Sequence, residues 1–194
     1  AMVLARLKKQ PELHNVNQFV TVTAGHSNKD PGAVRGKDKE ADFVVKVRNA
    51  VELYLLRAGL EVKTDGSGGI NLPLTNAIQI AEGASTKVEF HLNASDNPKA
   101  NGIETIALPK DKKLAQAISQ AIAGVTGGVL RGDKGWIDQS QSARGKLGFV
   151  SNGGLVVELG FLSNPAEFAV LEAKYWLVAQ SIADVIIAHE KALK

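Results

Sequence analysis

The sequence predicts an α/β fold, in which a mostly parallel, twisted central sheet is sandwiched between helices in a single domain covering residues 1–194. Strand-like segments alternate with segments of helical periodicity through most of the chain, as in parallel-sheet proteins. Residues 154–161 form an almost continuously apolar run, which is typical of a strand buried on both faces. With 194 residues, 44% of them hydrophobic, the chain can bury one core.

The first half of the chain predicts strand, helix, strand and helix. Residues 18–25, QFVTVTAG, alternate in polarity and are rich in β-branched side chains, which predicts a strand. Residues 39–58 place apolar side chains on one face at three- and four-residue steps, and Gly59 follows as a helix terminator. Residues 60–64, LEVKT, predict a short strand, and a second helix is expected to begin after Pro73.

The second half predicts two further strands, a long helix and a helical C-terminus around the central strand. The segments KVEFHLNAS (87–95) and NGIETIALP (101–109) have strand character, and DKKLAQAISQAIAGV (111–125) has one apolar helical face. The polar residues 126–145 are expected to form a loop. Residues 168–193 have helical periodicity, as one helix or two. Loops at the carboxyl ends of such strands are the expected site of function.

The composition excludes several classes of site and partner. The chain contains no cysteine, so a metal would have to be bound through nitrogen and oxygen. Its apolar runs are too short to span a bilayer, and we expect no membrane insertion. Aromatic residues make up 5% of the chain and the charges are dispersed, which argues against a nucleic-acid partner. A net charge of +3 is compatible with an anionic polymer as partner but does not require one.

Four polar side chains stand out from their surroundings: His26, Glu40, His91 and Glu158. His26 follows the first strand among turn residues, where functional groups concentrate, although a lone histidine there is more often structural. Glu40 opens the first long helix, where the helix dipole by itself favours an acidic residue. His91 is expected on the polar face of its strand. None of the first three is decisive alone.

Glu158 is the strongest single indication, because it interrupts the apolar strand LVVELGF. Burying a carboxylate among such neighbours costs several kcal/mol unless a cation or a hydrogen-bond donor meets it. Two readings follow from the residues alone. Glu158 is either one half of a structural ion pair with Arg or Lys, or a general base whose proton affinity is raised by burial.

Two histidines and a carboxylate are a common ligand set for a catalytic zinc ion, which keeps one position open for water. Such an ion lowers the pKa of its water from about 15.7 to about 7. His26, Glu40 and His91 could hold the ion, and Glu158 could accept the proton of the zinc-bound water. The remaining histidines are weaker candidates: His14 lies in a polar N-terminal stretch, and His189 lies near the end of the last helix.

Several ordered segments carry a resemblance to a known family. AGHSNKDPGAV, the glutamate of KEADF, FHLNAS, GIETIALP, RGDKGW and LVVELGFLSNPAE follow one another over nearly the whole chain. In these segments the chain resembles the zinc-dependent N-acetylmuramoyl-L-alanine amidases of bacterial autolysins and phage endolysins. The resemblance implies one Zn²⁺ per chain, held by His26, Glu40 and His91, with Glu158 as the catalytic acid/base.

The reaction implied by this resemblance is hydrolysis of the amide between N-acetylmuramic acid and the first L-alanine of the peptidoglycan stem peptide. The chain departs from many relatives shortly before its last strand, where GFVSNGG has no basic residue. A carboxypeptidase or another zinc peptidase on the same scaffold would use the same four residues. A non-catalytic wall-binding module is a second alternative, which predicts the loss of one or more of them.

The biological setting is an expectation of the same kind. We expect action at the bacterial cell wall by a monomer, because a polymer-degrading site gains little from assembly. No apolar segment with a small-residue cleavage site is seen at the N-terminus. The expected origin is therefore a phage-type lysin made in the host cytoplasm, or a domain excised from a secreted enzyme.

Overall fold

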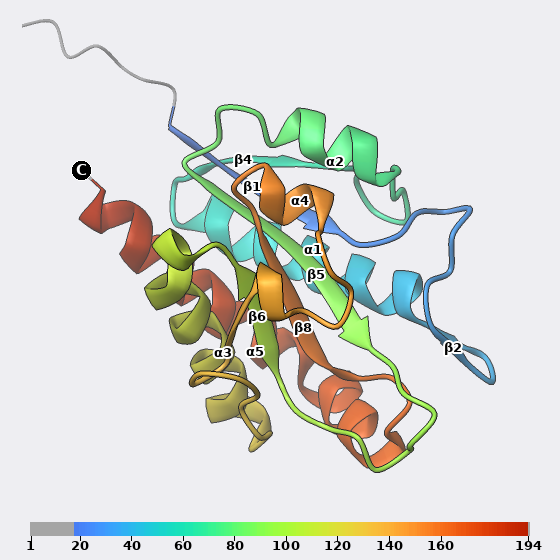
Figure 1. The fold of residues 1–194 in the computed structure, drawn as a ribbon. Helices are drawn as coiled ribbons and strands as arrows, with labels where there is room; N and C mark the ends of the chain where they lie inside the picture. The colour runs from blue at the N-terminus through green and yellow to red at the C-terminus, as the bar shows by residue number, and fades with distance from the viewer. Residues whose placement is uncertain (1–17, 194) are drawn as a thin grey trace, which may run out of the picture.

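The computed structural model describes residues 18–193, which form a sheet covered by helices on both faces (Figure 1). The predicted domain of residues 1–194 therefore lies partly outside the described residues. The weaker candidate His14 lies outside them altogether. The elements in chain order are β1 (Phe19–Ala24), β2 (Val34–Arg35), β3 (Asp38–Lys39), α1 (Glu40–Arg57), β4 (Glu61–Thr64), α2 (Leu74–Ile80), β5 (Thr86–Asn93), β6 (Glu104–Ala107), η1 (Pro109–Asp111), α3 (Lys112–Thr126), β7 (Trp136–Asp138), η2 (Gln139–Gln141), α4 (Gly148–Ser151), β8 (Leu155–Phe161) and α5 (Pro165–Ala192).

The main sheet has six strands in the order β4-β1-β5-β8-β6-β7. All neighbouring strands are parallel except β6 and β8, which run antiparallel. The predicted mostly parallel sheet flanked by helices is thus confirmed. The strand expected to be central, β8, lies between β5 and β6 and is buried along its whole length.

The two faces of the sheet are covered to different depths. On one face, alternate strand residues such as Val22, Phe90 and Val157 share a large core with α1, α3 and α5. On the other face, Ile106 and Val156 pack under the short helices α2 and α4, which lie together in the upper part of Figure 1. Polar strand residues on this second face therefore lie under a thin layer, and this is where the candidate site forms.

Two segments differ from the sequence-based expectation. Residues 126–145 were expected to form a loop, but Trp136–Asp138 form β7, which pairs with the edge strand β6. Three residues are too few to show a periodicity. Residues 168–192 belong to one continuous helix, α5, and Leu193 is its C-cap. The helix starts earlier than expected because the Asn164 side chain accepts hydrogen bonds from the N–H groups of Ala166 and Glu167, at 3.1 Å each. Within residues 18–193, no helix has the length and apolar character needed to cross a membrane.

Candidate metal centre

Parallel pairing brings the predicted site residues to one edge of the sheet. Strands β1, β5 and β8 are neighbours and run in the same direction, so their carboxyl ends meet. His91 in β5 is the register partner of Glu158 in β8. His26 follows β1 by two residues, and Glu40 is the first residue of α1. All four predicted residues therefore converge.

His26, Glu40 and His91 form one compact cluster. One ligand atom from each lies within 4.8 Å of the others. The Glu40 carboxylate lies between the rings, with Oε2 at 2.9 Å from His26 Nε2 and Oε1 at 3.0 Å from His91 Nδ1. The same oxygens accept hydrogen bonds from the N–H groups of Ala33 and Leu92, at 2.9 and 3.0 Å. Glu40 is thereby fixed in place by the backbone on both sides.

Two further carboxylates, which the sequence reasoning did not include, hold the outer nitrogens of the histidines. Asp30 Oδ2 lies 2.9 Å from His26 Nδ1, and Glu89 Oε1 lies 2.8 Å from His91 Nε2. Such carboxylate–histidine pairs orient metal-binding rings and raise their basicity. Strand periodicity places Glu89 on the same face as His91, two residues before it, but assigns it no role. Asp30 had no comparable signal, since turn geometry determines its position.

The backbone around the cluster leaves no room for extra side-chain atoms. A Cβ added at Gly25 would lie 2.2 Å from Cε1 of His91, and one at Gly32 would lie 2.6 Å from Glu40 Oε2. Gly32 also has a positive φ of 65°. His26 itself has φ 66°, which is uncommon for a residue with a side chain and is often found at functional sites. The turn after β1 is thus shaped around the cluster.

Without a metal, the cluster favours the protonated forms of its histidines. Burial lowers the pKa of His91, but hydrogen bonds to Glu40 and Glu89 outweigh this and raise the pKa to about 10. Burial also lowers the pKa of His26, but the Glu40 carboxylate outweighs this effect, so the pKa is raised. Burial raises the pKa of Glu40, but the two histidines outweigh this effect and hold the pKa far below its usual range. A cation at the centre of this cluster would replace those protons.

The donor set fits a zinc ion. Zinc accepts imidazole nitrogen and carboxylate oxygen, and catalytic sites commonly have three protein ligands. His26 Nε2 is buried and, within residues 18–193, has no hydrogen-bond partner of suitable geometry, although Glu40 Oε2 is 2.9 Å away. A buried nitrogen without a partner is available to bind an ion, and His26, Glu40 and His91 each offer one ligand atom within 4.8 Å of the others.

Glu158 lies beside this cluster as the register partner of His91. His91 and Arg144, which both approach Glu158, help to line a cavity of about 360 Å³ together with His26 and Glu89. The Glu158 side chain is completely buried, and neither carboxylate oxygen has a hydrogen-bond partner among the described residues. Burial raises its pKa above the ordinary value, while the positive charges of His91 and Arg144 act in the opposite direction. No hydrogen bond within the described residues therefore occupies the oxygens of this carboxylate.

Arg144 is a site residue that the sequence reasoning missed. Its Nη2 lies 3.3 Å from Glu158 Oε1, across fourteen residues of chain. This distance is short enough for the predicted ion pair. Because neither Glu158 oxygen accepts a hydrogen bond within the described residues, the predicted role as a base is compatible with the geometry as well. The segment GFVSNGG contains no basic residue, but Arg144 in the loop just before it places a guanidinium beside Glu158. Sequence offered no indication that this loop folds back over β8.

Comparison with known proteins agrees with this architecture. Residues 20–188 match the family model of N-acetylmuramoyl-L-alanine amidases. Over 94 residues the chain is 32% identical to the N-acetylmuramoyl-L-alanine amidase AmiA of Escherichia coli (strain K12), which covers 47% of this chain. The matched segment spans about a third of that relative, 32% of its length.

Solved structures are similar over almost the whole chain. A structure assigned as an N-acetylmuramoyl-L-alanine amidase from Neisseria meningitidis has a TM-score of 0.82 and 40% identity, with 91% of this chain and 97% of that chain covered. The catalytic domain of the amidase CwlV from Bacillus (Paenibacillus) polymyxa has a TM-score of 0.74 and 30% identity, with 90% and 98% covered. By its sequence match and its fold, the chain belongs to the N-acetylmuramoyl-L-alanine amidase family.

Proposed function

We propose that this protein hydrolyses the amide between N-acetylmuramic acid and the L-alanine of the peptidoglycan stem peptide. The observation that carries the proposal is the convergence of three ligand atoms, from His26, Glu40 and His91, within 4.8 Å of one another beside a buried Glu158. Membership of the amidase family supports the same substrate and the same bond. The place of action that follows is the bacterial cell wall.

His26, Glu40 and His91 would hold one zinc ion per chain. When bound, such an ion supplies a Lewis acid for the scissile carbonyl and lowers the pKa of water from about 15.7 to about 7. Asp30 and Glu89 keep the two imidazole rings in orientation through their outer nitrogens. Glu40 keeps its carboxylate in place through the N–H groups of Ala33 and Leu92.

Glu158 is proposed as the general base and acid. Its carboxylate accepts a proton from the attacking water and then donates this proton to the departing alanine nitrogen, so that the amine leaves neutral. Burial favours the protonated carboxyl group, which makes the second transfer easier. Arg144 lies against Glu158 and lowers its pKa, which favours the carboxylate form that accepts the first proton.

A carboxypeptidase on the same scaffold is the second candidate, because the same four groups would serve it. Digestion of purified sacculi separates the two, since the amidase exposes a new amine on L-alanine and loses activity on chelation until zinc is restored. A new amine on a later residue of the stem would identify the carboxypeptidase instead. Binding to sacculi with no bond cleaved in the presence of zinc would indicate a wall-binding module.

We further propose that the chain acts as a single catalytic domain and as a monomer. Both hydrophobic clusters lie on the same sheet, one on each face, and this supports one folding unit. A single cooperative melting transition and a sedimentation mass of one chain are the expected results. A concentration-dependent mass would contradict the monomer.

A further inference from the structure

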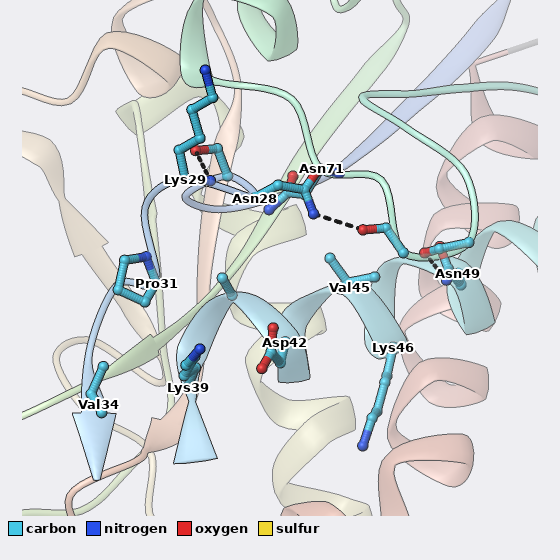
Figure 2. Close-up of a pocket in the computed structure, with 14 residues that line it drawn as sticks. Asn28, Lys29, Pro31, Val34, Lys39, Asp42, Val45, Lys46, Asn49 and Asn71 are labelled. Carbon is cyan, nitrogen blue, oxygen red and sulfur yellow. Dashed lines mark hydrogen bonds between the residues drawn. The ribbon is translucent and has the colours of Figure 1, made fainter. Parts of the chain in front are cut away.

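A second cavity, of about 540 Å³, is lined by the residues drawn in Figure 2, which include part of the turn after β1. Its walls come from the turn after β1, the outer face of the first half of α1, and the loop before α2. Ser27 follows His26 directly, while Lys39 and Ala41 flank Glu40. The cavity is therefore built next to two of the three proposed ligands, although no ligand lines it.

The charges around this cavity are mainly positive. Lys29, Lys39 and Lys46 line it and are exposed, against one carboxylate among the described lining residues, that of Asp42. Within residues 18–193, none of the three ammonium groups lies within 4.0 Å of a carboxylate. In Figure 2, Lys29 and Lys46 extend from opposite sides of the opening. Such a field favours an anionic ligand.

Side-chain amides hold the walls of the cavity in shape. Asn28 donates a hydrogen bond to the Gly69 carbonyl and Asn49 donates one to the Gly68 carbonyl, both at 2.8 Å. Behind these residues, the completely buried Arg48 and Asp65 pair at 3.0 Å and tie α1 to the same loop. The cavity is thus preformed, so ligand binding need not order its walls.

Asn71 lines the cavity and carries a side-chain acceptor without a donor among the described residues. Its side chain is 3% exposed, and its Nδ2 donates to the Gly25 carbonyl at 2.9 Å. Its Oδ1 is buried and has no donor among the described residues. A buried acceptor without a donor costs free energy, and a ligand N–H would remove this cost. A peptide with free carboxylates offers both kinds of group: carboxylates for the lysines and N–H donors for an acceptor such as Asn71 Oδ1.

We propose that this cavity is a second subsite, which binds the carboxylate-bearing part of the stem peptide beyond L-alanine. The inference rests on the proposed amidase function. Lys29 and Lys46 attract the carboxylates, and Asn71 Oδ1 accepts a hydrogen bond from a peptide N–H. The N-acetylated glycan of peptidoglycan carries no comparable charge, which favours the peptide as occupant.

The experiment compares the zinc-loaded double variant Lys29→Gln/Lys46→Gln with wild type and with a matched control, Lys99→Gln/Lys113→Gln. The control removes the same charge from two exposed lysines that do not line the cavity. The substrates are N-acetylmuramoyl-tripeptides whose second and third residues carry either free carboxylates or primary amides. KM and kcat are measured for each pair.

We expect the cavity variant to raise KM about five- to tenfold for the carboxylate substrate, while kcat changes less than twofold. The control should leave both constants unchanged, and the amidated substrate should show little difference between wild type and variant. An unchanged KM for the carboxylate substrate would overturn the subsite. An equal rise with the control, or with the amidated substrate, would overturn it as well.

Binding of the free tripeptide separates failure of the subsite from failure of the proposed function. Calorimetry with the zinc-loaded protein should show weaker binding of this peptide to the cavity variant than to wild type and control. If wild type cleaves no muramoyl–alanine bond but this difference persists, the amidase proposal fails and the subsite stands. If the amidase activity is present and the difference is absent, the subsite alone fails.

Discussion

Two carboxylates that are not proposed ligands determine which nitrogen of each histidine faces Glu40. Asp30 occupies the Nδ1 side of His26, and Glu89 occupies the Nε2 side of His91. The two rings consequently present different nitrogens to the same point, Nε2 from one and Nδ1 from the other. At the scale of single residues, the site is defined by these pairs and by the buried carboxylate beside them.

The roles of base and ligand separate in variants. Glu158→Gln keeps the shape of the side chain and removes only its ability to accept a proton, so zinc content should remain at one ion per chain while kcat falls about 10²- to 10⁴-fold. His91→Ala should lose both metal and turnover. Elemental analysis and an assay on sacculi check these outcomes. Wild-type turnover by Glu158→Gln would remove this residue from the mechanism.

Arg144 should set the acidic limit of activity through Glu158. The ratio kcat/KM falls as the pH drops through the pKa of Glu158, because the protonated carboxyl group accepts no proton. The guanidinium favours the ionised form, so Arg144→Met raises the pKa of Glu158 and moves the acid limb of the pH profile to higher pH. Lys146→Met, at an exposed position in the same loop, is the control and should leave the limb in place. A profile unmoved by Arg144→Met would exclude this coupling.

Zinc uptake should depend on pH because the ligands must lose protons. In the metal-free cluster the pKa of His91 is raised to about 10, so its ring is protonated at neutral pH, and the raised pKa of His26 favours its protonated form as well. Binding therefore releases protons, and the apparent zinc affinity should rise as the pH is raised through the neutral range. Titration calorimetry in buffers of different protonation enthalpy counts the protons released. A heat that is the same in every buffer would contradict this expectation.

At the scale of elements, the end of β1 and the start of α1 are matched to the side chains they approach. Gly25 lets β1 pass the ring of His91, and Gly32 lets the following turn pass Glu40. The loop before α2 is tied to α1 by the Arg48–Asp65 pair, which is completely buried on both sides. The arrangement of backbone segments, and not the ligand side chains alone, determines the geometry of the cluster.

Gly25→Ala tests the close approach directly. The added methyl group would meet the His91 ring at 2.2–2.5 Å, so either the ring or β1 has to move. We expect weaker zinc binding, by about tenfold or more, measured by competition with a chromophoric chelator. Gly124→Ala is the control, since a Cβ there meets nothing within 4 Å; in a helix it should stabilise the fold by about 0.5–1 kcal/mol. Unchanged zinc affinity in Gly25→Ala would show that the ring has room to adjust.

At the scale of the whole molecule, the site occupies the thinly covered face of an otherwise deeply buried sheet. The three helices α1, α3 and α5 bury one face, so this face carries most of the core. The opposite face is covered by α2 and α4 and leaves the carboxyl ends of the strands open as a cavity. A metal held by His26, Glu40 and His91 would connect β1, α1 and β5, which are separate segments of the chain.

Zinc should therefore stabilise the native state as a whole. An ion that binds the folded chain alone stabilises it by about 4 kcal/mol at a thousandfold excess over Kd, which corresponds to a rise in Tm of roughly 10 °C for a chain of this size. Calorimetry with and without zinc measures the shift. His26→Ala should show little or none of it, and an equal rise in this variant would place the stabilising metal elsewhere.

The sequence by itself determined the alternation of strands and helices, the central strand and the four polar residues of the site. Each of these has a local signal: a period of two or 3.6 residues, or a polar side chain inside an apolar run. The tertiary structure alone decided that β6 runs antiparallel to β8, that Trp136–Asp138 pair as an edge strand, and that Arg144 reaches Glu158. These features depend on register and packing between distant segments, which no local pattern of residues encodes.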